Sequence, residues 1–101
     1  MENDILKDLL VISADSNMKA GITAILNRPE AIDIRPITFE IYTHPEHDPG
    51  CRCKGASFSR LFIGQFSHCL MLFDHEGCGA ENTPAHGLEK QIEQEFNKIG
   101  W

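Results

Sequence analysis

The chain has 101 residues, of which 42% are hydrophobic and 24% are charged, and its formal net charge is -6. These proportions are typical of a folded domain and exclude a disordered chain or a fibrous repeat, while the acidic balance argues against broad attraction to a phosphate backbone. No apolar run reaches the ~20 residues of a membrane span and the acidic N-terminus does not resemble a secretory signal, so we expect one cytoplasmic domain over residues 1–101 with no membrane partner.

Three apolar runs predict three strands. Residues 9–14 and residues 68–73 are almost continuously apolar, which is typical of strands that are buried on both faces. Residues 37–42 alternate apolar and polar side chains, as expected of an edge strand with one wetter face. We therefore expect the third strand to have a neighbour on each side.

Helical patterns lie between and after these strands. Residues 16–27, 57–66 and 84–99 carry apolar side chains at helical spacing. The last of these helices is preceded by Thr83, a favoured N-cap residue, and has Pro84 in its first turn. The βαβαβα order predicts an α/β fold of three layers, with a mainly parallel three-stranded sheet covered by helices on both faces. The apolar stripes of the last two helices are formed by Phe58, Leu61, Phe62 and Phe66, and by Leu88, Ile92, Phe96 and Ile99.

Only three strands are available to supply the neighbours of the third strand, and the sequence ends on the apolar Trp101. We therefore expect either a partner chain that completes the sheet, as in a homo-oligomer, or a longer protein of which this sequence is the N-terminal portion. Self-association of the isolated chain is expected, because unpaired strand edges and uncovered apolar surface promote it.

Side chains that bind metals follow each predicted strand. Asp15 closes the first strand, His44 follows the second, and Asp74 and Glu76 follow the third. Ligands of an open parallel sheet bind beyond the carboxyl ends of its strands, so these four residues form a candidate catalytic site. Their carboxylates suit Mg²⁺ or Mn²⁺, which would orient a phosphodiester and activate water. The alternative for Asp15 is a structural role as a helix cap.

Residues 43–53 are polar, contain two prolines and a glycine, and are predicted to form a loop. This segment offers four ligands for Zn²⁺, which predict an alternative metal site even though its Cys-x-Cys spacing is tighter than usual. Two other interpretations remain open, namely an ordinary polar loop and a nucleophilic pair of a cysteine with a histidine. We expect reduced cysteines rather than disulfides. The four ligands are His44, His47, Cys51 and Cys53, and the nucleophilic pair is Cys51 with His44.

Three segments together resemble a group of prokaryotic proteins that are related to Toprim nuclease folds and are found with phage-defence islands. They are Asp15, the sequence HPEHDPGC at residues 44–51, and the sequence FDHEGCG at residues 73–79. The resemblance covers essentially the whole chain, and the members of the group continue into further strands and helices. In Toprim domains a glutamate after the first strand and an Asp-x-Asp after a later strand hold Mg²⁺ for DNA cleavage or strand transfer. The resemblance implies that Asp15, Asp74 and Glu76 take these positions. The negative charges are the same as in Toprim domains, but the side chains at the first and last of these positions differ in length.

We therefore expect Mg²⁺-dependent phosphodiester chemistry on nucleic acid in prokaryotic defence, with other defence-system proteins as partners. The alternative is a non-enzymatic binding module of a defence complex, with a zinc-stabilised loop over residues 44–53. Arg52, Lys54 and Arg60 form a local basic cluster. Such a cluster is typical of either a phosphate contact or a solvated helix face.

Overall fold

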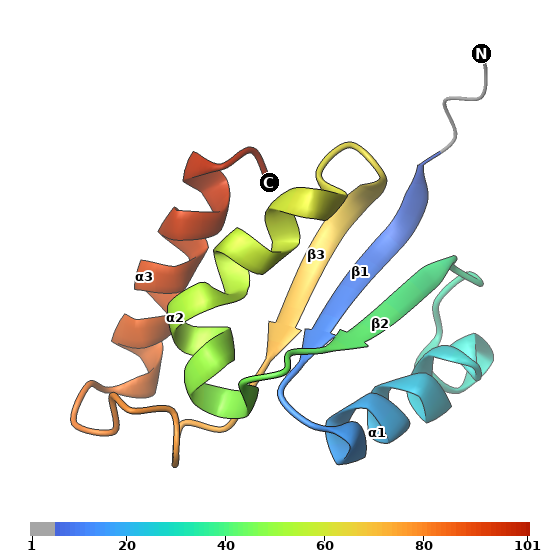
Figure 1. Ribbon diagram of the computed structural model, residues 1–101. Helices are drawn as coiled ribbons and strands as arrows, with labels where there is room; N and C mark the ends of the chain where they lie inside the picture. Colours follow the sequence, from blue (N-terminus) through green and yellow to red (C-terminus); the bar gives the residue numbers. More distant parts are fainter. Residues whose placement is uncertain (1–5) are drawn as a thin grey trace.

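The computed structural model describes residues 6–101 and has three parallel strands and three α-helices in three layers (Figure 1). The predicted α/β class and the predicted order of elements are therefore confirmed. In chain order the elements are β1 (Lys7–Ser13), α1 (Ser16–Leu26), the 3-10 turn η1 (Pro29–Ile32), β2 (Phe39–Thr43), α2 (His47–Ser59), the 3-10 turn η2 (Arg60–Phe62), β3 (Phe66–Leu72) and α3 (Ala85–Lys98).

The sheet has the strand order β2-β1-β3, so that β1 is the central strand. Val11 of β1 is in register with Ile41 of β2 on one side and with Leu70 of β3 on the other. The residues around Val11 are fully buried, as their apolar run predicts. The expectation that β3 has two neighbours is wrong, because β3 lies at an edge and Leu70 is 39% exposed. The strand has the apolar composition of a central strand although it lies at an edge, and some of its apolar side chains are therefore exposed.

The helices cover the two faces of the sheet unequally (Figure 1). The crossover from β1 to β2 and the crossover from β2 to β3 run in opposite directions across the sheet, which sends α1 and α2 to opposite faces. The main core lies between the sheet and α2, and α3 packs beside α2. On the other face, α1 packs against β2 and β1 and leaves β3 open. The core residues are Leu10, Ile12, Ala14, Cys51 and Phe66.

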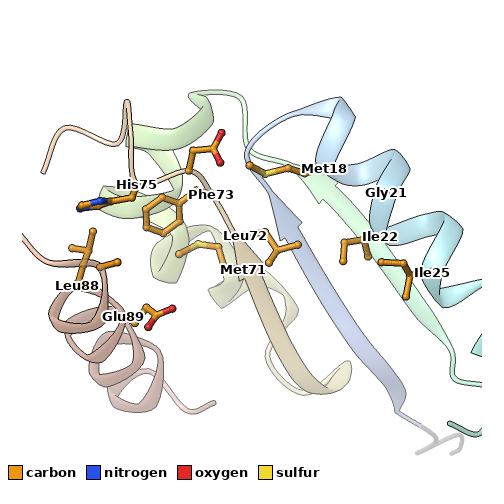
Figure 2. A pocket seen from close by; sticks show the side chains of 12 residues that line it. Met18, Gly21, Ile22, Ile25, Met71, Leu72, Phe73, His75, Leu88 and Glu89 are labelled. Atoms are coloured by element: carbon orange, nitrogen blue, oxygen red, sulfur yellow. The ribbon is translucent and has the colours of Figure 1, made fainter. Parts of the chain in front are cut away.

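An apolar groove of about 510 Å³ lies on the open face of β3. Figure 2 shows Ile22 and Ile25 of α1 on one side of this groove and Leu88 of α3 on the other, with Leu72 and Phe73 between them. The uneven cover therefore leaves a continuous apolar surface around the carboxyl half of β3.

The predicted loop at residues 43–53 is wrong, because α2 begins at His47. Pro49 falls in the first turn of this helix, where a backbone N–H has no partner within the helix and proline is tolerated. Gly55 lets the helix approach the sheet closely, because a Cβ atom there would displace the end of the Met71 side chain on β3. The composition typical of a loop thus belongs to a helix that has proline in its first turn and lies close to the sheet.

The helix predicted for residues 57–66 is also wrong in its bounds, since α2 ends at Ser59 and β3 already begins at Phe66. Leu61 is 74% exposed and does not belong to the core stripe. Phe58 and Phe62 pack against the core as expected. The spacing of the apolar residues predicts a continuous helix here, but the η2 turn interrupts it between α2 and β3.

The last helix agrees with its prediction except at its N-terminus. α3 spans Ala85–Lys98 and buries Leu88 and Ile92, but Pro84 is its N-cap and the predicted cap at Thr83 is wrong. Across residues 6–101, no helix has both the length and the apolar character required to cross a membrane.

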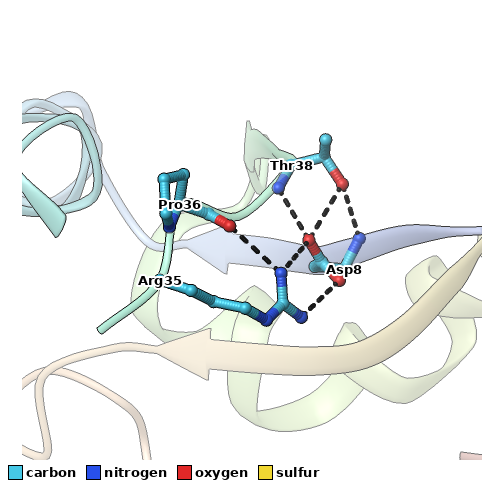
Figure 3. Close-up of polar contacts among 4 residues, drawn as sticks. All are labelled: Asp8, Arg35, Pro36 and Thr38. Atoms are coloured by element: carbon cyan, nitrogen blue, oxygen red, sulfur yellow. Dashed lines mark hydrogen bonds and ion pairs between the residues drawn. The ribbon is translucent and has the colours of Figure 1, made fainter.

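A polar network fixes the chain just before β2 (Figure 3). The Asp8 carboxylate accepts hydrogen bonds from Arg35 Nη2 at 3.0 Å and from the Thr38 backbone N–H at 2.9 Å. Arg35 also donates to the Pro36 carbonyl oxygen at 3.0 Å. Because Asp8 lies on β1, this network fixes the chain at the point where β2 aligns with β1.

Candidate functional site

Asp15 and Asp74 lie at the same end of two neighbouring strands. The last register pair between β1 and β3 is Ser13 with Leu72, and each aspartate follows its strand two residues later. The topology therefore brings together the carboxyl ends that carry these two predicted site residues. Ligands of open parallel sheets bind in this position, where the loops diverge between helices on opposite faces.

Asp15 is the N-cap of α1, because its Oδ1 atom accepts a hydrogen bond of 2.8 Å from the Met18 backbone N–H. The structural role that the sequence offered as an alternative is thus present. A capping carboxylate satisfies one free helical N–H with one of its oxygens. The cap leaves Oδ2 as the oxygen for any further interaction.

The first turn of α2 joins the ends of the two strands. His47 Nδ1 lies 2.9 Å from the carbonyl oxygen of Ala14, the residue after β1. Asp48 Oδ1 accepts a hydrogen bond of 2.8 Å from the backbone N–H of Asp74, after β3. These contacts place His47 and Asp48 beside the two strand-end aspartates. We call Asp15, His47, Asp48 and Asp74 the strand-end site.

The backbone of His47 has a φ angle of 58°, which lies in the left-handed region that residues with side chains seldom adopt. The Ala14 carbonyl can only accept a hydrogen bond, so Nδ1 of His47 must carry the proton. In the neutral ring Nε2 then holds a free lone pair, and the residue is exposed. His47 is therefore oriented as a proton acceptor or a metal ligand.

His44 is buried, with 4% of its surface exposed, and its ring packs against Phe58 at a centroid distance of 5.1 Å. Its Nδ1 accepts a hydrogen bond of 3.1 Å from the Glu46 backbone N–H. Burial lowers the pKa of His44, which favours the neutral ring. The contacts of His44 are thus those of a core residue, although the sequence suggested it as a catalytic one.

Glu76 lies in the exposed loop after β3, and a different acid organises this loop. Glu81 accepts a hydrogen bond of 2.8 Å from the Gly77 backbone N–H, and such backbone bonds lower the pKa of Glu81. Arg52 Nε donates to the Cys78 carbonyl oxygen at 2.6 Å and so fastens the same loop to α2. Sequence reasoning missed both contacts, because neither residue belongs to a recognisable metal or catalytic motif.

The four zinc-type ligands do not lie on a common loop. Cys51 is fully buried in the core and burial raises the pKa of its thiol to about 11, so it is a poor nucleophile. Cys53 is exposed, two residues further along the same helix and therefore about 200° around its axis. Within residues 6–101, no three or more His, Cys, Asp or Glu residues form a group that could hold a metal ion.

The predicted basic cluster is largely engaged within the chain. Lys54 Nζ lies 2.9 Å from a carboxylate oxygen of Glu46, and Arg52 holds the loop after β3. Arg60 is exposed at the end of α2. Little positive charge is therefore free to attract a phosphate on this helix.

Comparison with protein-family models, with curated proteins and with solved structures finds no match to this chain.

Proposed function

We propose that the chain carries out Mg²⁺- or Mn²⁺-dependent phosphodiester chemistry on nucleic acid at the strand-end site. The observation that supports this proposal is the equivalent position of Asp15 and Asp74 after neighbouring parallel strands. Mg²⁺ keeps several of its waters and often binds only one or two carboxylates together with substrate phosphates. A pair of aspartates is therefore a suitable ligand set without a third protein ligand.

Each residue of the strand-end site has a separate role in this proposal. The free oxygen of Asp15 and the exposed carboxylate of Asp74 would hold the ion. His47 would accept the proton of the attacking water at Nε2, because its other nitrogen is bound to Ala14. Asp48 would position Asp74 through the backbone. The bound ion would stabilise negative charge on the phosphate and make its own water more acidic.

The charge of the chain sets a condition on substrate binding. The net charge of -6 repels a phosphate backbone, and Arg52 and Lys54 are engaged in internal contacts. The divalent ion would then supply the positive charge that attracts the phosphate. We therefore expect nucleic acid to bind in Mg²⁺ or Mn²⁺ and to dissociate in a chelator.

Calorimetric titration with Mg²⁺ and Mn²⁺ tests the ligand set. Asp74→Asn should abolish the heat of binding, whereas Asp33→Asn, which removes an equal charge from the turn before β2, should retain it. Asp33 is a suitable control because its backbone is left-handed, a conformation that asparagine also tolerates. Equal heats for wild type and Asp74→Asn would refute the metal site.

Cleavage of end-labelled single-stranded and double-stranded DNA tests the chemistry. His47→Gln should reduce the rate about 100-fold or more, as is typical for loss of a general base, and should leave the heat of metal binding unchanged. A chain that binds the ion and cleaves neither substrate would lack the proposed activity. A chain that binds no Mg²⁺ or Mn²⁺, and that contains Zn²⁺ by elemental analysis, would support the non-enzymatic binding module instead.

A further inference from the structure

A second groove, of about 490 Å³, follows the free edge of β3. One wall is built from the consecutive residues 67–71 of β3, and the other from Ile92, Phe96 and Trp101. Side chains of consecutive strand residues point to opposite faces, so a groove lined by all of them runs along the edge itself. Figures 1 and 2 show α3 on the outer side of β3, beyond the last strand. The groove therefore has the position of a missing neighbouring strand.

The ladder between β1 and β3 determines which peptide groups face this groove. The Leu9 backbone N–H donates to the Thr38 carbonyl oxygen at 3.0 Å, and the Ser13 carbonyl oxygen accepts from the His44 N–H, so Leu9 and Ser13 face β2 and Leu10 and Ile12 face β3. Because Leu10 is in register with Cys69, this pattern directs the peptide groups of His68 and Leu70 toward β1. The N–H and C=O groups of Cys69 and Met71 then point outward. These outward groups form a template for one more strand.

The two edges of the sheet differ in their protection. β2 is five residues long, follows shortly after Pro36, and carries Glu40 in an ion pair with Lys7. Short length, charge and proline are the usual devices that prevent a strand edge from pairing. β3 has seven residues, FSHCLML, with neither a proline nor a Lys, Arg, Asp or Glu. Its edge therefore has the properties of a pairing surface.

A second copy of this chain does not suit the β3 edge. A twofold pairing of two β3 strands would place both α3 helices on the same face, above the same two central strands. Each α3 already extends beyond its own β3, so the two helices would occupy the same space. A single strand, in contrast, needs only about 4.8 Å beside β3.

The charge of the groove indicates what kind of strand fits. Its acidic lining residues are Glu89 and Glu93 of α3, and no lysine or arginine contributes to its described walls. We propose that the β3 edge binds an extended segment of a partner protein, with apolar residues and lysine or arginine, which joins the sheet as a fourth strand. This site is independent of the strand-end site and needs no metal.

The test uses the capped peptide Lys-Val-Thr-Val-Lys-Val-Thr and amide hydrogen exchange measured by NMR. Binding should slow exchange at Cys69 and Met71, whose N–H groups face outward, and should leave Leu70 unchanged because its N–H faces β1. A peptide with glutamate in place of both lysines should bind at least about tenfold more weakly, because its charges meet Glu89 and Glu93. A lysine peptide with alternate backbone nitrogens methylated should not bind.

Two sets of variants keep the result interpretable. Cys69→Pro removes one outward donor and should weaken binding about tenfold, whereas Cys69→Val keeps the donor and should retain binding. If Cys69→Pro does not fold, the Glu89→Lys and Glu93→Lys double variant remains informative, because it should bind the glutamate peptide in preference. Equal binding of both peptides to wild type, or no change in exchange at Cys69, would overturn the proposal. Protection that rises with protein concentration in the absence of peptide would do the same, since it would identify a second copy as the occupant.

Discussion

Asp48 Oδ1 accepts a hydrogen bond of 2.8 Å from the backbone N–H of Asp74, which joins the first turn of α2 to the chain just beyond β3. The two residues are far apart in the sequence, and Asp48 belongs to a segment with the composition of a loop. The contact fixes where the backbone of Asp74 leaves the sheet. It therefore controls the direction of the carboxylate on which the proposed metal site depends.

Loss of this hydrogen bond should loosen the segment after β3. Asp48→Ala should speed hydrogen exchange of the Asp74 amide and lower the free energy of unfolding by about 1–2 kcal/mol, as measured by urea denaturation. Asp48→Asn keeps an acceptor oxygen at the same place and should lose less. Equal losses for alanine and asparagine would show that the hydrogen bond itself contributes nothing.

The Asp8 network should make stability depend on pH under acidic conditions. Hydrogen bonds from Arg35, followed by the Thr38 N–H, lower the pKa of Asp8 from 3.8 to about 2. A lowered folded-state pKa means that the unfolded chain binds the proton more tightly. The contribution is therefore complete above about pH 4 and is lost as the pH falls toward 2.

The thermal midpoint, followed between pH 5 and pH 2, checks this sign. Arg35→Gln should raise the pKa of Asp8, measured by carboxyl carbon NMR, and should flatten the acid limb of the stability curve. Asp8→Asn should flatten it equally. An unchanged acid limb in both variants would assign the acid sensitivity to other carboxyl groups.

Most of the fold follows from patterns that are local in the sequence. The apolar run around Val11 and the stripe of α3 predict elements that the structure confirms. The errors arise where tertiary contacts override composition. α2 accepts proline because Pro49 lies in its first turn, and it accepts Gly55 because the glycine lets it approach Met71. The edge position of β3 could not be predicted, since an exposed apolar run and a buried one have the same composition.

The sequence indicates only part of the proposed strand-end site. Asp15 and Asp74 stand out in the sequence because each follows an apolar run, and the strand order makes their strands neighbours. His47 was assigned to a zinc loop, since its left-handed backbone and its contact with Ala14 leave no signal in the sequence. Asp48 was not selected, because its role is to accept a hydrogen bond from a distant backbone. Contacts of this kind require the register of the sheet.

Gly55 should gain less stability from alanine than Gly21 does. A Cβ atom at Gly55 would meet the Sδ and Cε atoms of Met71, which must move aside, whereas one at Gly21 in α1 meets nothing within 4 Å. Gly21→Ala should stabilise the fold by about 0.5–1 kcal/mol, because alanine favours the helix. Gly55→Ala should stabilise it by less, because the displaced Met71 offsets part of the same helical gain. The free energy of unfolding in urea checks both variants, and equal gains would contradict the close approach of α2 to β3.

The cysteines should differ sharply in reactivity toward a thiol reagent such as an aromatic disulfide. Burial raises the pKa of Cys51 to about 11 and that of Cys69 to about 12, and Cys78 is also buried. Only a thiolate attacks the reagent, so these three thiols should react on the timescale of unfolding. Cys53 is exposed and should react first. Mass spectrometry of the early product should find a single label, and Cys53→Ser should remove it without changing stability. Rapid labelling of Cys51 in the folded chain would contradict its place in the core. If added Zn²⁺ stabilised the wild type, and Cys53→Ser were less stable and gained nothing from Zn²⁺, the zinc alternative would be supported again.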